Sequence, residues 1–339
     1  MRVLVTGSSG LVGSAIVKRL CAHDIEVVGV DNNSRGHWFG SDGDVSNRIN
    51  HRNYSHIVGD ICDNSLLERI FFRPLDVIIH CAAQPSHDKS AEIPLIDFKI
   101  NALATVSLLE FTRQQSPEAL FIFVSTNKVY GENPDKVPLV ELPLRYSRPG
   151  GVNEGTPLDN TLHSPFGVSK AAADLMVQEY GLYYGLKTVC FRCGCITGED
   201  HRGVEMHGFL NYLCRCFATS KPYVIYGHGG KQVRDNIHAD DLARAFEEVI
   251  LNHPKPGSVY NMGGGVDNSC SILEAMFALE KLHGKEIVTF LGPARKGDHI
   301  CYYTDYSKFQ ADYPNWRVQI SLEQIFGRIY DRCSSNSNL

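Results

Sequence analysis

Long hydrophobic runs are missing from this chain of 339 residues. A helix that crosses a bilayer needs about 20 consecutive apolar residues, and no run approaches that length. The chain also lacks any block of Lys or Arg, and its formal net charge is −5. Because nucleic-acid-binding surfaces are strongly basic, we expect neither a membrane protein nor a nucleic-acid-binding protein. Met1 leads directly into a strand-like run and leaves no room for a signal peptide, so we expect a cytoplasmic location.

Disulfide bonds are not expected, although the chain has eleven cysteines. The number is odd, and a chain of this size does not need disulfides for stability. One group could be drawn as a zinc site: Cys190, Cys193, Cys195, Cys214 and Cys216. Alternation along a strand, however, sends Cys190 to the opposite face from Cys193 and Cys195. We therefore predict no metal site and interpret most cysteines as small buried hydrophobic residues.

The start of the chain has the pattern of a dinucleotide-binding turn. Residues 1–6 are a short apolar run, Gly7-Ser8-Ser9-Gly10-Leu11-Val12-Gly13 follows, and residues 14–22 have a helical pattern. A phosphate group can approach such a backbone where side chains are absent, and the helix N-terminus offers free N–H groups and a positive dipole end. We predict that these residues contact the pyrophosphate: Gly7, Ser9, Gly10, Leu11, Val12 and Gly13.

An acidic residue follows about 20 residues later, as the dinucleotide-binding pattern requires. The apolar run 26–30 ends at Asp31, whose carboxylate can accept hydrogen bonds from an adenosine ribose. The same carboxylate would repel a 2′-phosphate, so NAD is favoured over NADP. Arg35 keeps the phosphate form open, and we add Asn32 and Arg35 to the predicted cofactor contacts.

Strand-like and helical stretches alternate along the first half of the chain. The strand-like runs are 57–59, 76–81, 120–125 and 187–192, and the helical stretches are 64–72, 95–114 and 170–184. This alternation predicts an α/β fold with a Rossmann-type, doubly wound parallel sheet. Ligands bind at the carboxyl ends of such strands, so we expect Asp60, Ala82-Ala83-Gln84 and Ser125-Thr126 to face one cleft.

The regular pattern breaks after residue 192, which indicates a second, smaller and discontinuous α/β domain. Its expected elements are 206–217, 223–226, 258–262, 271–283 and 287–290, while 240–251 returns to the sheet. We predict a dinucleotide-binding domain of residues 1–192 plus 231–257, a substrate-binding cap of 193–230 plus 258–333, and a disordered tail of 334–339. The long segments 34–53 and 143–165 are each interpreted as a lid or a surface loop.

Six motifs occur in order over nearly the whole chain: Thr6-Gly7-Ser8-Ser9-Gly10-Leu11-Val12-Gly13, Asp60-Ile61-Cys62-Asp63, His80-Cys81-Ala82-Ala83, Ser125-Thr126-Asn127-Lys128-Val129-Tyr130-Gly131, Ser169-Lys170, and Arg234-Asp235-Asn236-Ile237-His238. Together they resemble the nucleotide-sugar epimerases and dehydratases of the extended short-chain dehydrogenase/reductase family. Within it, the Ser125 to Gly131 motif and His163-Ser164-Pro165 most resemble the CDP-paratose 2-epimerase (CDP-tyvelose epimerase) group. The resemblance implies a tightly bound NAD that takes a hydride from a sugar carbon and returns it to the other face.

In this family a tyrosine removes the alcohol proton, a lysine lowers the pKa of that tyrosine, and a Ser or Thr hydroxyl orients the substrate oxygen. By motif position Thr126 and Lys170 fill two of these roles, while Phe166 occupies the tyrosine position. A phenyl ring cannot carry a proton. Three interpretations stay open: the base has moved, the protein binds its ligands without turnover, or the chain carries an engineered Tyr→Phe change.

Several residues are candidates for a relocated base. Cys195 stands where the family has an asparagine that faces the sugar, although a thiol there can equally be a small buried hydrophobe. His87, His163 and His207 lie in or near substrate-side segments and have a suitable unperturbed pKa of about 6.5. Lys170 could take the proton itself if it is desolvated.

Dehydration is disfavoured by two residues after the catalytic threonine. The sugar 4,6-dehydratases have an acidic pair there, whereas this chain has Asn127 and Lys128. An amide and an ammonium group cannot supply a carboxylic acid and a carboxylate. Decarboxylation of a uronic acid stays an alternative within the family, with no clear carboxylate-binding group to support it.

The resemblance also implies a nucleotide-diphosphate sugar as partner. Arg234 and Arg295 match positions that hold the diphosphate, and Asp298 matches one that binds the nucleotide ribose. Further expected substrate contacts are Gln84, Ser86, His87, Thr126, Asn127, His207 and Phe209, and further cofactor contacts are Asp60, Ile61, Ala82, Ala83, Gln84, Asn101 and Lys170. The helical stretches 95–114 and 170–184 resemble the pair that forms a dimer contact in the family, which predicts a homodimer or a tetramer.

Overall fold

The computed structural model describes residues 1–40, 49–205 and 207–336. The chain divides into two compact units, which we describe separately. Unit 1 consists of Met1–Val129, Ser164–Arg192 and Leu242–Tyr260, and unit 2 of Tyr130–His163, Cys193–Asp241 and Asn261–Leu339. In the described part of the chain, no helix is long and apolar enough to cross a membrane.

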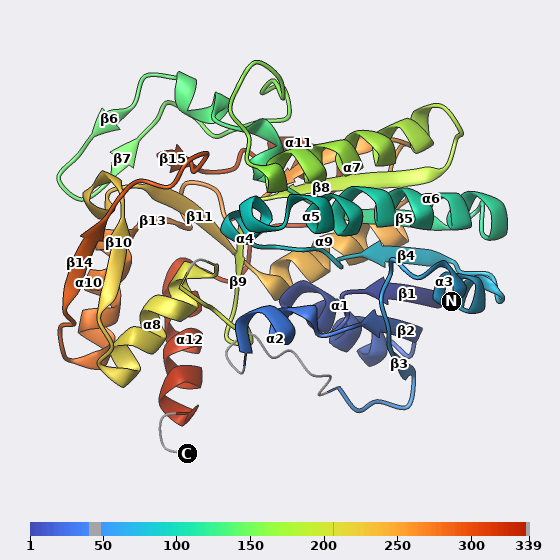
Figure 1. Ribbon diagram of the computed structural model, residues 1–339, viewed down its shortest axis with the longest axis horizontal. Helices are drawn as coiled ribbons and strands as arrows, with labels where there is room; N and C mark the ends of the chain where they lie inside the picture. The colour runs from blue at the N-terminus through green and yellow to red at the C-terminus, as the bar shows by residue number, and fades with distance from the viewer. Residues whose placement is uncertain (41–48, 206, 337–339) are drawn as a thin grey trace. The chain divides into compact units, whose positions relative to one another are not determined.

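A seven-stranded sheet with the order β12-β8-β5-β4-β1-β2-β3 organises unit 1, and Figure 1 shows its strands from β8 to β3. Its strands are β1 (Arg2–Thr6), β2 (Glu26–Asp31), β3 (Tyr54–Val58), β4 (Val77–His80), β5 (Leu120–Thr126), β8 (Lys187–Cys193) and β12 (Ser258–Met262). The strand pairs β1–β2, β1–β4, β2–β3 and β4–β5 are parallel. Since helices cover both faces, the central strands are almost continuous apolar runs. The predicted doubly wound Rossmann-type fold is confirmed.

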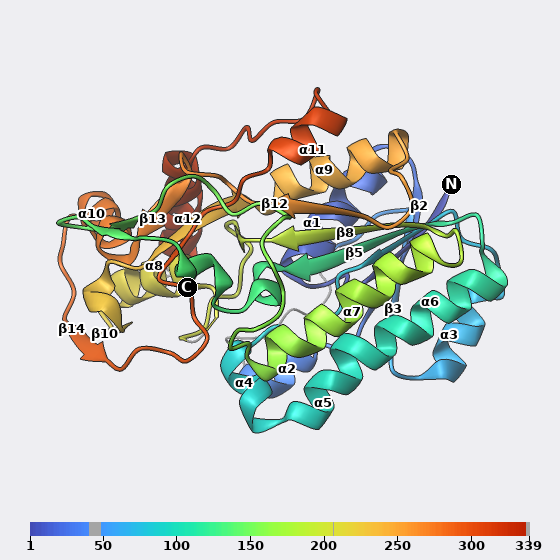
Figure 2. The same ribbon diagram turned by 90° about the horizontal axis from the view of Figure 1, so that it is seen from above.

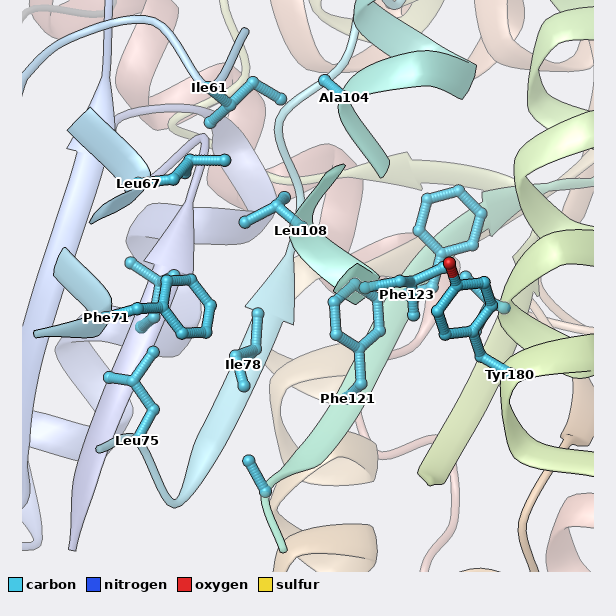
Figure 3. Packing of buried hydrophobic residues seen from close by; sticks show 14 of the residues in the cluster. Ile61, Leu67, Phe71, Leu75, Ile78, Ala104, Leu108, Phe121, Phe123 and Tyr180 are labelled. Carbon is cyan, nitrogen blue, oxygen red and sulfur yellow. The ribbon is translucent and has the colours of Figure 1, made fainter. Parts of the chain in front are cut away.

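Helices connect these strands and close the core of unit 1. They are α1 (Leu11–Ala22), α2 (Ser34–Phe39), α3 (Asn64–Phe71), α4 (His87–Glu92), α5 (Pro94–Phe98), α6 (Ala104–Gln115), α7 (Pro165–Leu182) and α9 (Ala239–Leu251). Figure 2 shows α6 and α7 side by side along the sheet, where they pack against each other. Figure 3 shows Phe71, Leu108, Phe121 and Tyr180 filling the space between sheet and helices. Each such buried side chain stabilises the fold by about 1.5–3 kcal/mol.

The helical stretch predicted over 95–114 contains an irregular turn. Residues Lys99–Leu103 form a π-helix between α5 and α6. Single π turns are frequent at functional sites because they redirect a side chain. The buried Asn101 lies in this turn, where its side chain bonds to the backbone of Gln84.

Two predicted elements need correction. Residues Ser258–Met262 were assigned to the cap, but β12 is an edge strand of the large sheet, where Val259, Tyr260 and Met262 are buried. Helix α7 begins at Pro165 rather than at Lys170. The Ser164 side chain accepts a hydrogen bond from the Gly167 N–H, and a proline suits the first turn of a helix.

Unit 2 is a smaller α/β assembly with its own core. A four-stranded sheet is formed by β9 (Cys195–Thr197), β11 (Val233–His238), β13 (Ser269–Ser271) and β15 (Cys301–Tyr302). Two short sheets pair β10 (Tyr223–Tyr226) with β14 (Thr289–Gly292) and β6 (Val140–Glu141) with β7 (Tyr146–Ser147). The helices are α8 (Phe209–Thr219), α10 (Ile272–His283), α11 (Ser307–Asp312) and α12 (Leu322–Asn336). Leu213, Phe217, Leu279 and Ile325 are central to its hydrophobic cluster.

The division into units differs from the predicted domains. Residues 130–163 and 231–241 were assigned to the first domain, but both belong to unit 2. The segment 130–163 is held there by side-chain bonds: the Asp135 carboxylate accepts the N–H groups of Ile300 and Cys301, at 2.9 and 3.1 Å. Local alternation of strands and helices does not reveal such long-range bonds.

The expected tail and loops also differ in part. Helix α12 extends to Asn336, so the prediction of disorder from residue 334 is wrong for 334–336, while 337–339 lie outside the described residues. Cys333 packs against the hydrophobic cluster of unit 2, which holds the end of this helix. The segment 34–53 starts with helix α2, and its residues 41–48 lie outside the described part.

Candidate active site

The glycine-rich turn after β1 has the close backbone approach that a phosphate site requires. Gly7 has a φ of +67°, and a Cβ atom there would lie 2.7 Å from the backbone nitrogen of Ala82. A Cβ on Gly13 would lie 2.1 Å from the carbonyl oxygen of Gly7. Helix α1 begins at Leu11, so its free N–H groups and positive dipole end lie at this turn. The turn is therefore a backbone cradle that fits a pyrophosphate.

Asp31 ends β2 beside this turn. Its two carboxylate oxygens accept hydrogen bonds from the backbone N–H groups of Ser9 (3.1 Å) and Asn33 (2.7 Å). Burial raises the pKa of Asp31, although these two hydrogen bonds act in the opposite direction. The carboxylate is thus fixed next to the glycine turn, where its remaining lone pairs suit a ribose diol. Arg35 lies on α2 with its guanidinium 5.4 Å from the ring centre of Phe39, and burial lowers its pKa to about 10.

The other predicted cofactor residues follow β3 and β4. Asp60 accepts a hydrogen bond from the Cys62 N–H at 2.8 Å, and Ile61 is buried. The Ala82 N–H donates to the Thr6 hydroxyl at 3.2 Å, which ties the end of β4 to the end of β1. These residues all lie in unit 1, where the carboxyl ends of adjacent parallel strands meet.

A buried carboxylate organises the loop after β4. Asp97 on α5 accepts hydrogen bonds from the side chains of Gln84 (2.9 Å), Asn101 (3.1 Å) and Ser169 (2.5 Å). The Gln84 side chain in turn accepts the N–H of Ser86 at 2.6 Å. One carboxylate thus connects the loop 84–86, the π turn and helix α7, and it fixes the predicted contacts Gln84, Ser86 and Asn101.

Lys170 and Phe166 lie one turn apart on α7, so both side chains project from the same side of the helix. The Lys170 ammonium donates to the carbonyl oxygen of Val124 at 2.7 Å and lies 4.0 Å from the ring centre of Phe123. Lys170 is only 3% exposed, and Phe166 only 8%. The Phe166 N–H donates to the hydroxyl of Ser90 at 3.1 Å, which joins α7 to α4.

Thr126 ends β5, the strand whose carbonyl groups hold Lys170. Its hydroxyl accepts the Lys128 N–H at 3.2 Å, and the adjoining Asn127 is buried. Ser125 donates to the Asp174 carboxylate at 2.5 Å, and Asp174 pairs with the guanidinium of Arg192 at 2.8 Å. This buried ion pair on α7 and β8 fixes the strand end from which Thr126 projects.

Unit 2 brings together the three residues predicted to bind the nucleotide. The Arg234 guanidinium on β11 donates to the Asp298 carboxylate at 2.7 Å and to the carbonyl oxygen of His299. Arg295 lies on the other side of the same carboxylate, with 3.9 Å between its guanidinium nitrogen and an Asp298 oxygen. Two guanidinium groups therefore meet at one carboxylate, an arrangement that suits a diphosphate with a ribose next to it.

Cys195 begins β9 and pairs with Asn236 of β11 in parallel register. Side chains two residues apart on a strand share a face, so Arg234 lies on the same face of this strand pair as Cys195. His207 lies with its ring centre 5.5 Å from that of His201. Phe209 begins α8 and packs partly against the hydrophobic cluster of unit 2. Its contact with the core is a structural role that the sequence did not indicate.

Three further observations concern groups that could hold metals or protons. Within residues 1–40, 49–205 and 207–336, no three His, Cys, Asp or Glu side chains come together as a metal site would require. Cys190 is fully buried, and burial raises the pKa of its thiol. The His163 ring lies 3.2 Å from the carbonyl oxygen of Thr161.

Sequence reasoning missed the acidic residues that support the site. Asp97 on α5 and Asp174 on α7 are both fully buried. Such charges are rarely buried unless they are paired. For Asp97 the available signal was spacing, because this residue lies four positions before Asn101, whose side chain donates to it.

The fold is a doubly wound sheet with a glycine turn after its first strand and a carboxylate at the end of its second strand. With a buried lysine bonded to the strand that ends in a threonine, these features define a dinucleotide-dependent enzyme of the Rossmann type. The family model "NAD dependent epimerase/dehydratase family" matches residues 3–263. The chain belongs to this family, and its cofactor is NAD.

Three similar proteins extend this finding. CDP-paratose 2-epimerase of Salmonella typhi is 31% identical over 351 residues, which cover 99% of this chain and 100% of the relative. The UDP-glucose 4-epimerase of Thermotoga maritima, whose structure was solved with UDP-glucose, is 27% identical to this chain. Its TM-score is 0.81, and the match covers 99% of each chain. The UDP-glucose 4-epimerase of Thermus thermophilus, whose structure was solved with NAD, is also 27% identical. Its TM-score is 0.78, and the match covers 98% of this chain and 99% of that one.

Proposed function

We propose that this protein is an NAD-dependent epimerase that inverts one carbinol carbon of a CDP-linked sugar. The observation that carries the proposal is the buried Lys170 ammonium, which donates to the Val124 carbonyl oxygen of β5, the strand that ends at Thr126. The similarity to CDP-paratose 2-epimerase over the full length of both chains supports the choice of sugar nucleotide.

Inversion of a carbinol carbon requires its C–H bond to break. The chemistry that a bound NAD would supply is uptake of that hydrogen as a hydride and its return to the other face of the flat ketone. In this proposal Thr126 binds the reacting oxygen, Lys170 binds the nicotinamide ribose, and the Asp97 network holds Gln84 and Ser86 against cofactor and sugar. The reduced and oxidised forms interconvert within one turnover, so no net redox change is expected.

The nucleotide is assigned to unit 2. In the proposal Arg234 and Arg295 bind the diphosphate oxygens. Asp298 then gives up part of its contact with the two arginines and accepts hydrogen bonds from the ribose hydroxyls. The geometry supports this, since a single carboxylate now lies between both guanidinium groups. His207 and Phe209 are proposed to lie against the sugar nucleotide from the start of α8.

Dehydration is the other reaction that the family name covers. Eliminating water needs a carboxylic acid and a carboxylate close to the sugar. The two residues after Thr126 are Asn127, which is buried, and Lys128, whose backbone N–H bonds to Thr126. Neither side chain is a carboxylic acid, which favours epimerisation.

A second candidate function follows from Phe166. With a phenyl ring in the tyrosine position, the protein could bind NAD and a sugar nucleotide without turning the sugar over. The ordered supports around Lys170 and Thr126 favour catalysis over this alternative, because binding alone does not require a fixed reacting hydroxyl.

A homodimer formed through α5 to α7 of unit 1 is part of the proposal. Apolar side chains are exposed along these helices: Leu95, Ile96, Phe98, Leu103, Val168, Leu175 and Leu182. An exposed apolar surface of this kind is typical of a protein interface. Light scattering on the purified chain would give twice the monomer mass, and Leu175→Glu would reduce it. A cytoplasmic location stays a prediction.

The proposed function is tested by incubating the purified protein with CDP-, UDP- and GDP-hexoses in deuterated water and following the sugar by NMR. An epimer of a CDP-sugar without ring deuterium is the expected product, because the hydride returns from a bound cofactor. Deuterium at a ring carbon would indicate proton abstraction beside a ketone instead. No conversion of any sugar, with NAD bound, would favour the binding-only alternative.

A further inference from the structure

His87 lies at the start of α4, next to the position where the family tyrosine is replaced. The Ser90 hydroxyl donates to the carbonyl oxygen of His87 at 2.6 Å and accepts the N–H of Phe166 at 3.1 Å. The Ser90 hydroxyl therefore connects the backbone of His87 to the backbone of Phe166, and helices α4 and α7 are in contact. Both helices belong to unit 1, together with Thr126 and Lys170.

The His87 imidazole is enclosed without a hydrogen-bond partner. Both ring nitrogens are buried, and neither bonds to any residue in the described ranges. The side chain as a whole is 14% exposed. A buried polar atom without a partner costs about 1–3 kcal/mol, and a catalytic role is one of the explanations for such an atom in a native protein. A substrate hydroxyl that binds one ring nitrogen would remove part of this cost.

A carboxylate also lies beside this imidazole. The Nδ1 atom of His87 is 3.8 Å from an Asp88 oxygen. This distance is too long for a hydrogen bond, but catalytic contacts often shorten when the substrate binds. A carboxylate next to one ring nitrogen orients the other nitrogen toward substrate and stabilises the charged imidazolium, as in other base and carboxylate pairs.

We propose that His87 is the proton carrier that replaces the missing tyrosine. This inference rests on the proposed epimerase function. In the oxidation step the alcohol O–H proton moves to Nε2 of the neutral imidazole, the C–H hydrogen leaves as hydride to NAD, and a C=O bond forms. In the return step the hydride adds to the other face, and the imidazolium gives its proton back to the alkoxide oxygen. Protons and electrons balance without a further oxidant.

The contacts of the other candidate in unit 1 favour His87. The Lys170 ammonium donates to the Val124 carbonyl at 2.7 Å and lies over the Phe123 ring. An ammonium group has donors only, so in this arrangement it does not accept a proton. A neutral imidazole, in contrast, has one ring nitrogen that can accept a proton.

The test combines His87→Gln with Phe166→Tyr. The single His87→Gln variant should lose about 10²- to 10⁴-fold in kcat, the range of general acid–base catalysis, while NAD affinity stays within about twofold of the original chain. Phe166→Tyr in the same variant should restore most of the activity, because it supplies a phenolic base. His23→Gln is the matched control: this histidine is exposed on unit 1 and pairs with Glu247, so its variant should keep full activity.

A readout besides turnover follows the imidazole itself. In protein labelled with ¹³C at the histidine rings, the His87 signal, assigned by its loss in His87→Gln, should shift when CDP-glucose is added, and the His23 signal should not. If His87→Gln does not fold, as judged by its melting curve, His87→Asn takes its place.

Four results would overturn the role of His87: near-normal kcat without the imidazole, a loss that Phe166→Tyr does not repair, a loss explained by weaker NAD binding, or an unmoved His87 signal. Failure of the proposed function looks different, since the unmodified chain would then convert none of the CDP-sugars.

Discussion

The polar side chains of the two candidate binding regions differ in how far they are exposed to solvent. In unit 1 the groups around Lys170 are almost fully buried, and Asp97 accepts hydrogen bonds from three side chains. In unit 2 the side chains of Arg234, Arg295 and Asp298 keep 11%, 24% and 28% of their surface exposed. The first arrangement is fixed before any ligand binds, as bond-making chemistry requires. The second pairs charges with each other and can exchange partners when a charged ligand arrives.

Replacing Lys170 should have the largest effect. Lys170→Met removes a buried cation that bonds to Val124 and lies over Phe123, and we expect kcat to fall by about 10³-fold. Steady-state kinetics and an NAD titration would measure it. Lys187→Met is the control, because that lysine forms an exposed ion pair with Glu118. If kcat of Lys170→Met fell by less than about tenfold, the proposal that unit 1 carries the chemistry and unit 2 only binds the nucleotide would be contradicted.

Breaking the ion pair behind Thr126 should reduce stability rather than chemistry. Asp174→Asn leaves the buried Arg192 charge without its full partner, which costs about 3–5 kcal/mol of unfolding free energy. Urea unfolding followed by circular dichroism gives this quantity. The exposed pair of Lys187 and Glu118 provides the comparison, since Glu118→Gln should cost less than about 1 kcal/mol. Equal costs for both variants would mean that burial does not distinguish the two pairs.

A smaller and different change is expected in unit 2. Arg234→Lys keeps the charge but loses the planar pair of donors, so we expect KM for the sugar nucleotide to rise about tenfold, or ~1.4 kcal/mol, with kcat nearly unchanged. Arg332→Lys, which changes an arginine on the exposed face of α12, should leave KM unaltered. If kcat falls as strongly as KM rises, Arg234 takes part in the transition state and not only in binding.

The smallest effect concerns acid sensitivity in unit 2. The hydrogen bond from His238 at 2.8 Å lowers the pKa of Glu199 to about 2. Because the folded-state pKa is below the unfolded value of about 4.3, this carboxylate stabilises the fold above that pH. The contribution is lost as the pH falls from about 4.3 toward 2.

Urea unfolding of Glu199→Gln across this pH range should show a shallower loss of stability than the original chain. Glu286→Gln, on an exposed segment of the same unit, is the control. Identical pH profiles for the original chain and Glu199→Gln would contradict this assignment.

The fold of unit 1 was predictable because its signals are local. A glycine turn, an acid about 20 residues later and alternating strands and helices follow from backbone geometry and periodicity. The boundary errors have another origin. Residues 130–163 were assigned to the wrong unit because bonds such as those from Asp135 to Ile300 and Cys301 span long stretches of sequence.

For the candidate site, the dinucleotide-binding pattern predicts Asp31, and the family motifs predict Lys170 and the two arginines. The roles of these four residues stay predictions. Asp97 was not found, because a single acidic residue on a helix normally faces solvent, and only the fold shows that three donors surround it. The missing partners of His87 are likewise invisible in the sequence, since they depend on how α4 packs against α7.

The central claim is that unit 1 transfers a hydride between a bound sugar and its own NAD. Rapid mixing of the NAD-bound protein with a converted CDP-sugar, followed by nicotinamide absorbance, tests it most directly. We predict a transient rise of the reduced form at the rate of turnover, followed by its return to the starting level. Formation of the epimer without any reduced nicotinamide during turnover would contradict the account.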